Sequence, residues 1–178
     1  MKKPNLKVLI PAEKIEKRIK ELALEIADCY RGEEITLIGI IKGALPFFMK
    51  LTSYLDLPQK WDFMALSSYG NTTKSSGVLK INMDLGNSIA GKHVLIVEDI
   101  IDTGLTMEYL LKSLKTRKPA SIKICSLLFK KGNLRKKIKI DFTGFEIPTE
   151  FVVGFGLDCA ERYRELPDIC CIPNKEKK

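Results

Sequence analysis

Residues 94–107, VLIVEDIIDTGLTM, combine groups that bind a phosphate with groups that repel one. A branched apolar run ends at two acids, Glu98 and Asp99, and a short turn follows: Asp102, Thr103, Gly104, Leu105 and Thr106. A glycine lets the backbone approach a ligand closely, and hydroxyls and free N–H groups at a helix start donate to phosphate oxygens. Carboxylates beside a phosphate need a divalent cation or sugar hydroxyls between them. The segment therefore predicts a phosphate site that also binds a metal, a sugar or both.

The surrounding pattern predicts that this segment joins a buried strand to a helix. Residues 93–97 read as the strand, and Leu105, Tyr109, Leu110 and Leu114 recur at helical spacing. Further helices are predicted between Pro11 and Gly32 and across 47–55, with strands at 35–41, 61–67, 78–83, 122–129 and 150–153. Apolar strands that alternate with helices indicate an α/β fold with a mostly parallel central sheet flanked by helices. Ligands bind at the carboxyl ends of such strands, where the acids stand.

Acids after an apolar strand also occur in receiver domains and P-loop nucleotidases, but neither class fits this sequence. A receiver domain carries its acidic pair near the chain start, whereas Glu98 follows 97 residues. A P-loop requires G-x-x-x-x-G-K-[ST], which this sequence lacks. A purely structural role, with Asp102 as a helix N-cap and the acidic pair in a solvated loop, accounts for each residue singly. It does not account for all of them following one buried strand.

Length and composition favour one ordinary domain. The chain has 178 residues, of which 45% are hydrophobic, enough for a single core. No apolar run has the length of a membrane span, and the run after the basic start is too short for a signal peptide. A cytoplasmic protein without a membrane partner is therefore expected. Five cysteines without C-x-x-C spacing and one histidine predict neither a zinc site nor a disulfide framework.

The formal net charge of +8 admits several interpretations. Basic residues cluster at 130–139 and 175–178. They could form a solvated surface, steer a small anion or bind nucleic acid. No recognition-helix, zinc-finger or RNP motif accompanies the charge, so a small anion is favoured over nucleic acid. The segment 131–139 receives no specific role.

The segment VLIVEDIIDTGLTM is similar to the phosphoribosyl pyrophosphate motif of the type I phosphoribosyltransferases. From about Leu37 to Leu166, further segments resemble the hypoxanthine-guanine phosphoribosyltransferases in order and spacing. These are IKGA at 41–44, SSYG at 67–70, SLLFK at 126–130, FVVGFGLD at 151–158 and ERYR at 161–164.

This resemblance implies a fold and an activity. The expected fold is the α/β type I phosphoribosyltransferase fold as one domain over 1–178. Its core would span about 33–145, a small hood would comprise about 146–172 with part of the N-terminus, and 173–178 would be a flexible tail. The implied activity is purine salvage: Mg²⁺-dependent transfer of the phosphoribosyl group from phosphoribosyl pyrophosphate to hypoxanthine or guanine, giving IMP or GMP and pyrophosphate. The look-alikes are usually homodimers or homotetramers.

The resemblance also implies roles for the residues that face phosphoribosyl pyrophosphate. Glu98 and Asp99 would hold its ribose hydroxyls, and residues 102–106 its 5′-phosphate. Lys42 and Gly43 would form the loop that meets the pyrophosphate, in which the family commonly has a cis peptide bond. Arg164 would reach the pyrophosphate as well. The implied metal-binding acids are Asp158, Glu98 and Asp99.

The remaining implied roles concern the purine and a lid. Lys130 would donate to the purine O6, Phe151 would stack on the base, and the Val152 backbone would contact its edge beside Asp158. Asp102 would exchange a proton near the purine N7, as the catalytic group. Ser68 and Tyr69 would lie on a loop that closes over the reacting carbon, because water would attack the same oxocarbenium-like centre.

Some positions depart from the family pattern, and two alternatives stay open. Leu105 stands where many relatives carry a lysine or arginine. Phe155 and Cys159 replace frequent aromatics near the base pocket, which leaves the ranking of hypoxanthine, guanine and xanthine undecided. One alternative is a regulatory RNA-binding protein on the same fold, which the basic charge favours and the retained purine-site residues oppose. The other, an orotate or pyrimidine transferase, shares the phosphate motif but lacks the segment 151–158.

Overall fold

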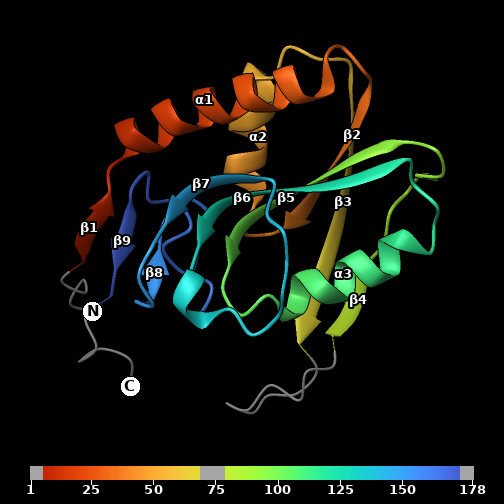
Figure 1. Cartoon of the computed structure of the whole chain (residues 1–178). Coiled ribbons are helices and arrows are strands. Elements are labelled where there is room, and N and C mark those ends of the chain that lie inside the picture. The colour runs from red at the N-terminus through yellow and green to blue at the C-terminus, as the bar shows by residue number, and fades with distance from the viewer. Residues whose placement is uncertain (1–5, 69–78, 173–178) are drawn as a thin grey trace.

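A six-stranded sheet forms the centre of the computed structural model, which describes residues 6–68 and 79–172 (Figure 1). Its strands follow the order β4-β3-β2-β5-β6-β7. They are β2 (Ile35–Ile41), β3 (Gln59–Ser68), β4 (Leu79–Met83), β5 (His93–Ile101), β6 (Ser121–Phe129) and β7 (Phe142–Glu146). Only β3 and β4 pair antiparallel; every other neighbouring pair is parallel. The predicted α/β fold with a mostly parallel sheet is confirmed.

Helices cover both faces of this sheet. α1 (Ala12–Tyr30) and α2 (Leu45–Tyr54) lie on one face, and α3 (Leu105–Lys115) lies on the other (Figure 1). Successive side chains of β5 alternate between the two faces of the sheet. Leu95 and Val97 pack with residues of α1 and α2, whereas Val94 and Ile96 pack with residues of α3. None of the helices within the described ranges has the length and apolarity to span a bilayer.

The central strand β5 is longer than the sequence predicted. The apolar run stops at Val97, but parallel pairing with β6 continues, with Glu98 opposite Ser126 and Ile101 opposite Phe129. Glu98 and Asp99 therefore lie within the strand, not in a loop after it. Because adjacent residues of a strand face opposite sides, Glu98 turns toward the α3 side and Asp99 toward the α1 and α2 side.

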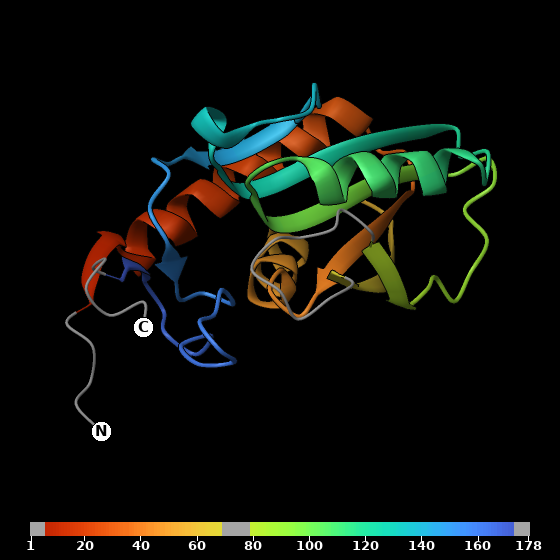
Figure 2. The ribbon, with the colours of Figure 1, turned by 90° about the horizontal axis from the view of Figure 1, so that it is seen from below.

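A second, antiparallel sheet joins the two ends of the described chain. It contains β1 (Lys7–Ile10), β9 (Ile169–Cys171) and β8 (Val152–Val153), in the order β1-β9-β8; we call it the hood sheet. Figure 2 shows these strands gathered at the end of the molecule where α1 begins. The strand predicted over 150–153 is shorter, because only Val152 and Val153 pair with β9. The short strands β1, β7 and β9 were not predicted.

The loop after β8 folds back onto the end of β2. Gly154 and Gly156 both have positive φ, and the Gly156 N–H and carbonyl bond to the Arg164 carbonyl and guanidinium at 2.9 and 2.8 Å. A Cβ at Gly156 would lie 2.0 Å from the Gly43 carbonyl oxygen. Glycine is therefore required there, because two backbones touch. This contact places the 154–164 loop beside the loop that follows β2.

Candidate active site

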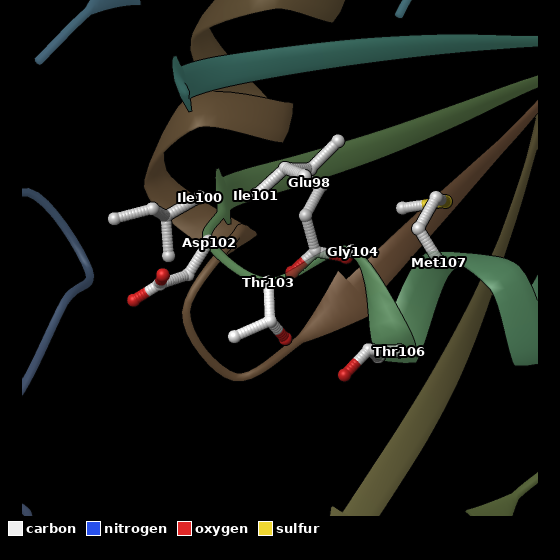
Figure 3. Close-up of a pocket in the computed structure, with 8 residues that line it drawn as sticks. All are labelled: Glu98, Ile100, Ile101, Asp102, Thr103, Gly104, Thr106 and Met107. Atoms are coloured by element: carbon white, nitrogen blue, oxygen red, sulfur yellow. The ribbon is translucent and has the colours of Figure 1, made fainter. Parts of the chain in front are cut away.

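The turn between β5 and α3 forms a small polar cavity at the carboxyl edge of the sheet. The cavity has a volume of about 110 Å³. Figure 3 shows the residues that line it, which are Glu98, Ile100, Ile101, Asp102, Thr103, Gly104, Thr106 and Met107. Gly104 stands before the first residue of α3 with φ +79°, so the chain turns sharply there and the first N–H groups of the helix face the turn. Such a turn can hold a phosphate.

The basic segment after β6 packs over this turn. The Arg135 N–H donates to the Thr103 carbonyl at 3.0 Å, and a Cβ at Gly104 would lie within 3.0 Å of Ile138 and Leu134 side-chain carbons. Residues 134–138 of the segment 131–139, to which no role was assigned from the sequence, therefore hold the backbone of the phosphate turn. Some cations of this segment form ion pairs outside the phosphate turn. Lys136 Nζ, for example, lies 3.1 Å from Glu108 Oε2.

Glu98 and Asp99 form a pair of acids, of which Asp99 is buried and Glu98 is partly buried. Glu98 Oε2 is buried and has no hydrogen-bond partner among the described residues, and Asp99 is 8% exposed. Burial raises the pKa of Glu98 well above its usual range, and the neighbouring Asp99 carboxylate raises it further. Burial also raises the pKa of Asp99. Two adjacent acids, one of them with an unpartnered buried oxygen, favour a ligand that supplies hydroxyl donors or a metal ion.

Glu98→Gln is expected to stabilise the ligand-free fold at neutral and alkaline pH. The folded chain holds the Glu98 proton to a higher pH than the unfolded chain does. The stabilisation that this proton gives is complete below the ordinary carboxyl pKa and is lost as the pH rises through the raised folded pKa. The amide carries no charge, so the melting temperature of the variant should exceed that of the wild type near about pH 8, with the difference shrinking toward about pH 5.

Thermal melts of the two proteins across this range check the prediction. Glu33→Gln, at an exposed carboxylate outside the site, is the control and should give the same small difference at every pH. A Glu98→Gln difference that does not depend on pH would contradict the assigned burial of the acid.

The loop after β2 presses against Asp99. A Cβ at Gly43 would lie 1.7 Å from Asp99 Oδ2, so the loop backbone and this carboxylate are in direct contact. The peptide bond between Ile41 and Lys42 is cis, as the resemblance implied. Asp99 is held in turn by the Ile100 N–H, which donates to Oδ1 at 2.7 Å.

The cations of this region are paired with carboxylates of the 154–164 loop. Arg164 Nη2 lies 2.8 Å from Asp158 Oδ1 and 3.4 Å from Glu161 Oε2, and Lys42 Nζ lies 3.1 Å from the same Glu161 oxygen. These contacts lower the pKa of Glu161, with Lys42 as the main cause. Arg164 Nε is buried and has no partner within the described part of the chain. Glu161, which belongs to the ERYR segment but received no role from the sequence, thus links the two cations.

A second cavity, of about 340 Å³, opens between the Gly43 loop, the acid pair and Arg164. Its polar lining includes Ser67, Glu98, Asp99, Thr106, Asp158 and Arg164. Within the described residues, no three acidic, histidine or cysteine side chains converge closely enough to hold a metal ion by themselves.

A third cavity, of about 300 Å³, brings the predicted purine residues together. It is lined by Asp99, Ile100, Asp102, Lys130, Phe151, Val152, Leu157 and Asp158. Lys130 is only 6% exposed, and its Nζ lies 3.2 Å from Asp102 Oδ2. Phe151 is 38% exposed, so a large part of the side chain is open to a ligand.

The three cavities are neighbours. The first and second share Glu98 and Thr106, the second and third share Asp99 and Asp158, and the first and third share Ile100 and Asp102. The structure therefore assembles the predicted phosphate, acidic and purine residues around one centre. Lys42 lies beside this centre, where its Nζ donates to Glu161 Oε2. Ser68 ends β3, and Tyr69 lies outside the described residues, so the expected lid is not described.

Comparison with known proteins identifies the family of this chain. The phosphoribosyl transferase domain model matches residues 9–160. The hypoxanthine-guanine phosphoribosyltransferase of Bacillus subtilis is 52% identical over 163 residues, which cover 92% of this chain and 91% of that protein. The chain belongs to the hypoxanthine-guanine phosphoribosyltransferase family. The family predicted from the motifs is therefore confirmed.

Solved structures of the family share its fold. The hypoxanthine phosphoribosyltransferase of Trypanosoma cruzi in complex with the product IMP has a TM-score of 0.90 and 40% identity, covering 97% of this chain and 96% of that one. Another structure of the same enzyme, from work on its C-terminal region, oligomeric state and activity, has a TM-score of 0.91 and 39% identity and covers 98% and 96% of the two chains.

Proposed function

We propose that the chain transfers the phosphoribosyl group of phosphoribosyl pyrophosphate to hypoxanthine or guanine, which gives IMP or GMP and releases pyrophosphate. The observation that carries this proposal is the meeting of three cavities at the carboxyl edge of the sheet, each lined by residues suited to one part of the reaction. The family relatives bear the same activity in their names.

The phosphate and ribose are assigned to the β5–α3 turn and the acid pair. Residues 102–106 would hold the 5′-phosphate with backbone N–H groups and with the hydroxyls of Thr103 and Thr106. Leu105 contributes only its backbone, because its side chain has no donor. Glu98 and Asp99 would accept hydrogen bonds from the ribose hydroxyls, which would satisfy the unpaired Glu98 oxygen.

The pyrophosphate is assigned to the Gly43 loop and Arg164. The buried Nε of Arg164, which has no partner among the described residues, would gain an acceptor there. Lys42 and Arg164 are already paired with Glu161 and Asp158, so the pyrophosphate would compete with these carboxylates for both cations. Donors placed at the departing oxygens would stabilise the charge that develops as the C1′–O bond breaks.

The purine is assigned to the cavity beside Lys130. Lys130 would donate to the purine O6, Phe151 would stack on the ring, the Val152 backbone would contact its edge, and Asp158 would border the ring. The attacking base loses a proton, and Asp102, which pairs with Lys130 at the start of the phosphate turn, would accept it. We assign Ser68 and Tyr69 to a lid that excludes water from C1′.

Magnesium fits this arrangement as an ion that would be coordinated by both the protein and the substrate. Glu98, Asp99 and Asp158 offer the hard oxygen ligands that Mg²⁺ prefers, and all three are among the residues that line the second cavity. These acids do not form a complete metal site alone, so Mg²⁺ would need oxygens of phosphoribosyl pyrophosphate as well. When bound, it would neutralise charge on the leaving pyrophosphate.

We also assign the protein to the cytoplasm and expect a homodimer or homotetramer. The small hood would comprise about 146–172 with part of the N-terminus, which includes the hood sheet and the 154–164 loop, and about 33–145 would be the core of the same domain. The Trypanosoma cruzi relative links its C-terminal region to oligomeric state, and the hood sheet is where the described part of this chain ends.

An assay with phosphoribosyl pyrophosphate, Mg²⁺ and separate purine and pyrimidine bases tests the proposed function. Nucleotide should form with hypoxanthine or guanine, not with adenine or uracil, and a chelator should abolish it. The rate with xanthine sets its place in the ranking. A folded protein that makes nucleotide from none of these bases would contradict the proposal.

A further inference from the structure

The Asp102 carboxylate is held at both oxygens by residues from one turn. Lys130 Nζ lies 3.2 Å from Oδ2, and Asn133 Nδ2 donates to Oδ1 at 2.8 Å. Because a carboxylate only accepts hydrogen bonds, the NH₂ end of the Asn133 side chain must face it. Asn133 has no counterpart among the motif residues and was not predicted as a site residue.

The chain around Asn133 is anchored to the turn that carries Asp102. Asn133 ends the 3₁₀ turn η1 (Lys131–Asn133), in which its N–H donates to the Lys130 carbonyl at 3.1 Å. Side chains three residues apart point the same way on a 3₁₀ turn, so Lys130 and Asn133 reach the same carboxylate. The Arg135 N–H bonds to the Thr103 carbonyl, next to Asp102 in the chain. The distance between Asn133 and Asp102 is therefore fixed by backbone contacts.

Lys130 and Asn133 differ in whether the bound substrate competes with Asp102 for their hydrogen-bond donors. If Lys130 donates to the purine O6, as the proposed function requires, the base competes with Asp102 Oδ2 for the ammonium. Asn133 has no such competitor. Its amide can donate to Oδ1 while the carboxylate is charged, and also after Oδ2 has taken a proton, because Oδ1 then remains a carbonyl acceptor.

We infer that Asn133 is a positioning residue for proton transfer from the purine. It holds Oδ1 so that Oδ2 faces the base when Lys130 turns to the purine O6. The inference rests on the proposed function and adds to it the group that keeps the catalytic carboxylate oriented. Geometry of this kind has large effects on rate, because small displacements of a reacting group are costly.

Two variants separate positioning from a structural role. Asn133→Ala removes the donor and is expected to lower kcat about tenfold. Asn133→Asp keeps the size of the side chain but turns an acceptor and a negative charge toward Asp102, and is expected to lower kcat about a hundredfold. A residue that only shapes the turn predicts the reverse order, because aspartate suits turns and replaces asparagine with little change in volume.

The measurements are kcat, the KM values for both substrates, the Kd for phosphoribosyl pyrophosphate by titration calorimetry, and thermal melts. The Kd should change by less than about threefold in both variants, since only the chemical step is affected. Lys131→Ala, in the same turn with its ammonium 3.9 Å from Glu146, is the matched control and should keep wild-type kcat.

The outcomes are distinct. A fall in kcat that is larger for Asn133→Asp than for Asn133→Ala, with unchanged Kd, supports the inference. Wild-type kcat in Asn133→Asp, or a loss explained by weaker phosphoribosyl pyrophosphate binding, overturns it and leaves the proposed function intact. A wild-type protein without transferase activity overturns both. If Asn133→Ala melts below the assay temperature, the isosteric Asn133→Asp decides the matter alone.

Discussion

Asp102→Asn is expected to lower kcat with hypoxanthine about 10²- to 10⁴-fold, the usual contribution of a positioned general base. The amide cannot take up the purine proton, and it places an NH₂ group against one of the two donors, Lys130 or Asn133, that now hold the carboxylate. Steady-state kinetics give kcat, and calorimetric titration gives the Kd for phosphoribosyl pyrophosphate. The Kd should change little, because the backbone of the phosphate turn is unaltered.

Asp84→Asn is a suitable control, because Asp84 pairs with Arg117 and lines none of the three cavities. It should leave kcat unchanged. If Asp102→Asn retained more than about a tenth of wild-type kcat, Asp102 would have no part in proton transfer.

Gly43→Ala is expected to lower kcat/KM for phosphoribosyl pyrophosphate roughly a hundredfold, since a misplacement of about 1 Å can cost that much. The new Cβ would lie 1.7 Å from Asp99 Oδ2. Asp99 is buried and bonded to the Ile100 N–H, and the Gly43 carbonyl already touches Gly156, so neither side can yield without moving the site. Kinetics with varied phosphoribosyl pyrophosphate measure the effect.

Gly86→Ala is the matched control for this steric test. Among the described residues, the one atom within 4 Å of a Cβ at Gly86 is Asp62 Oδ1 at 4.0 Å. Neither glycine has a positive φ, so alanine strains neither backbone. The control should keep wild-type kcat/KM within about twofold. Equal activity in both variants would show that the contact between Gly43 and Asp99 has no role in substrate use.

Sequence periodicity predicted most of the central sheet and all three α-helices, because each has a long apolar run or stripe. This periodicity predicted the end of β5 at Val97, because two acids follow the apolar run there. In the structure β6 continues to pair with β5 up to Ile101, so the acids lie within the sheet, and desolvation of their carboxyl groups raises both pKa values. The strands β1 and β9 span four and three residues, too few for a periodic signal.

Motifs located the residues of the site but not their partners. The turn residues 102–106 and the segment 151–158 are contiguous in sequence, so a pattern could find them. Asn133 meets Asp102 across 31 positions, and Glu161 meets Lys42 across 119. Such pairs carry no local signal, because only the fold of the intervening chain brings them together.

The pairing of β1 with β9 has a consequence for the order in which the two sheets can fold during synthesis. Lys7, near the start of the described chain, pairs with Cys171, near its end, and β8 in turn pairs with β9. On a ribosome, all six strands of the central sheet are synthesised before β9, so the sheet and the phosphate turn can form while the chain is still growing. β1 and β8, by contrast, have no partner until β9 has left the ribosome. The half of the site assigned to the sugar phosphate can therefore fold before β9 is made, whereas the half assigned to the purine is completed only after β9 has emerged.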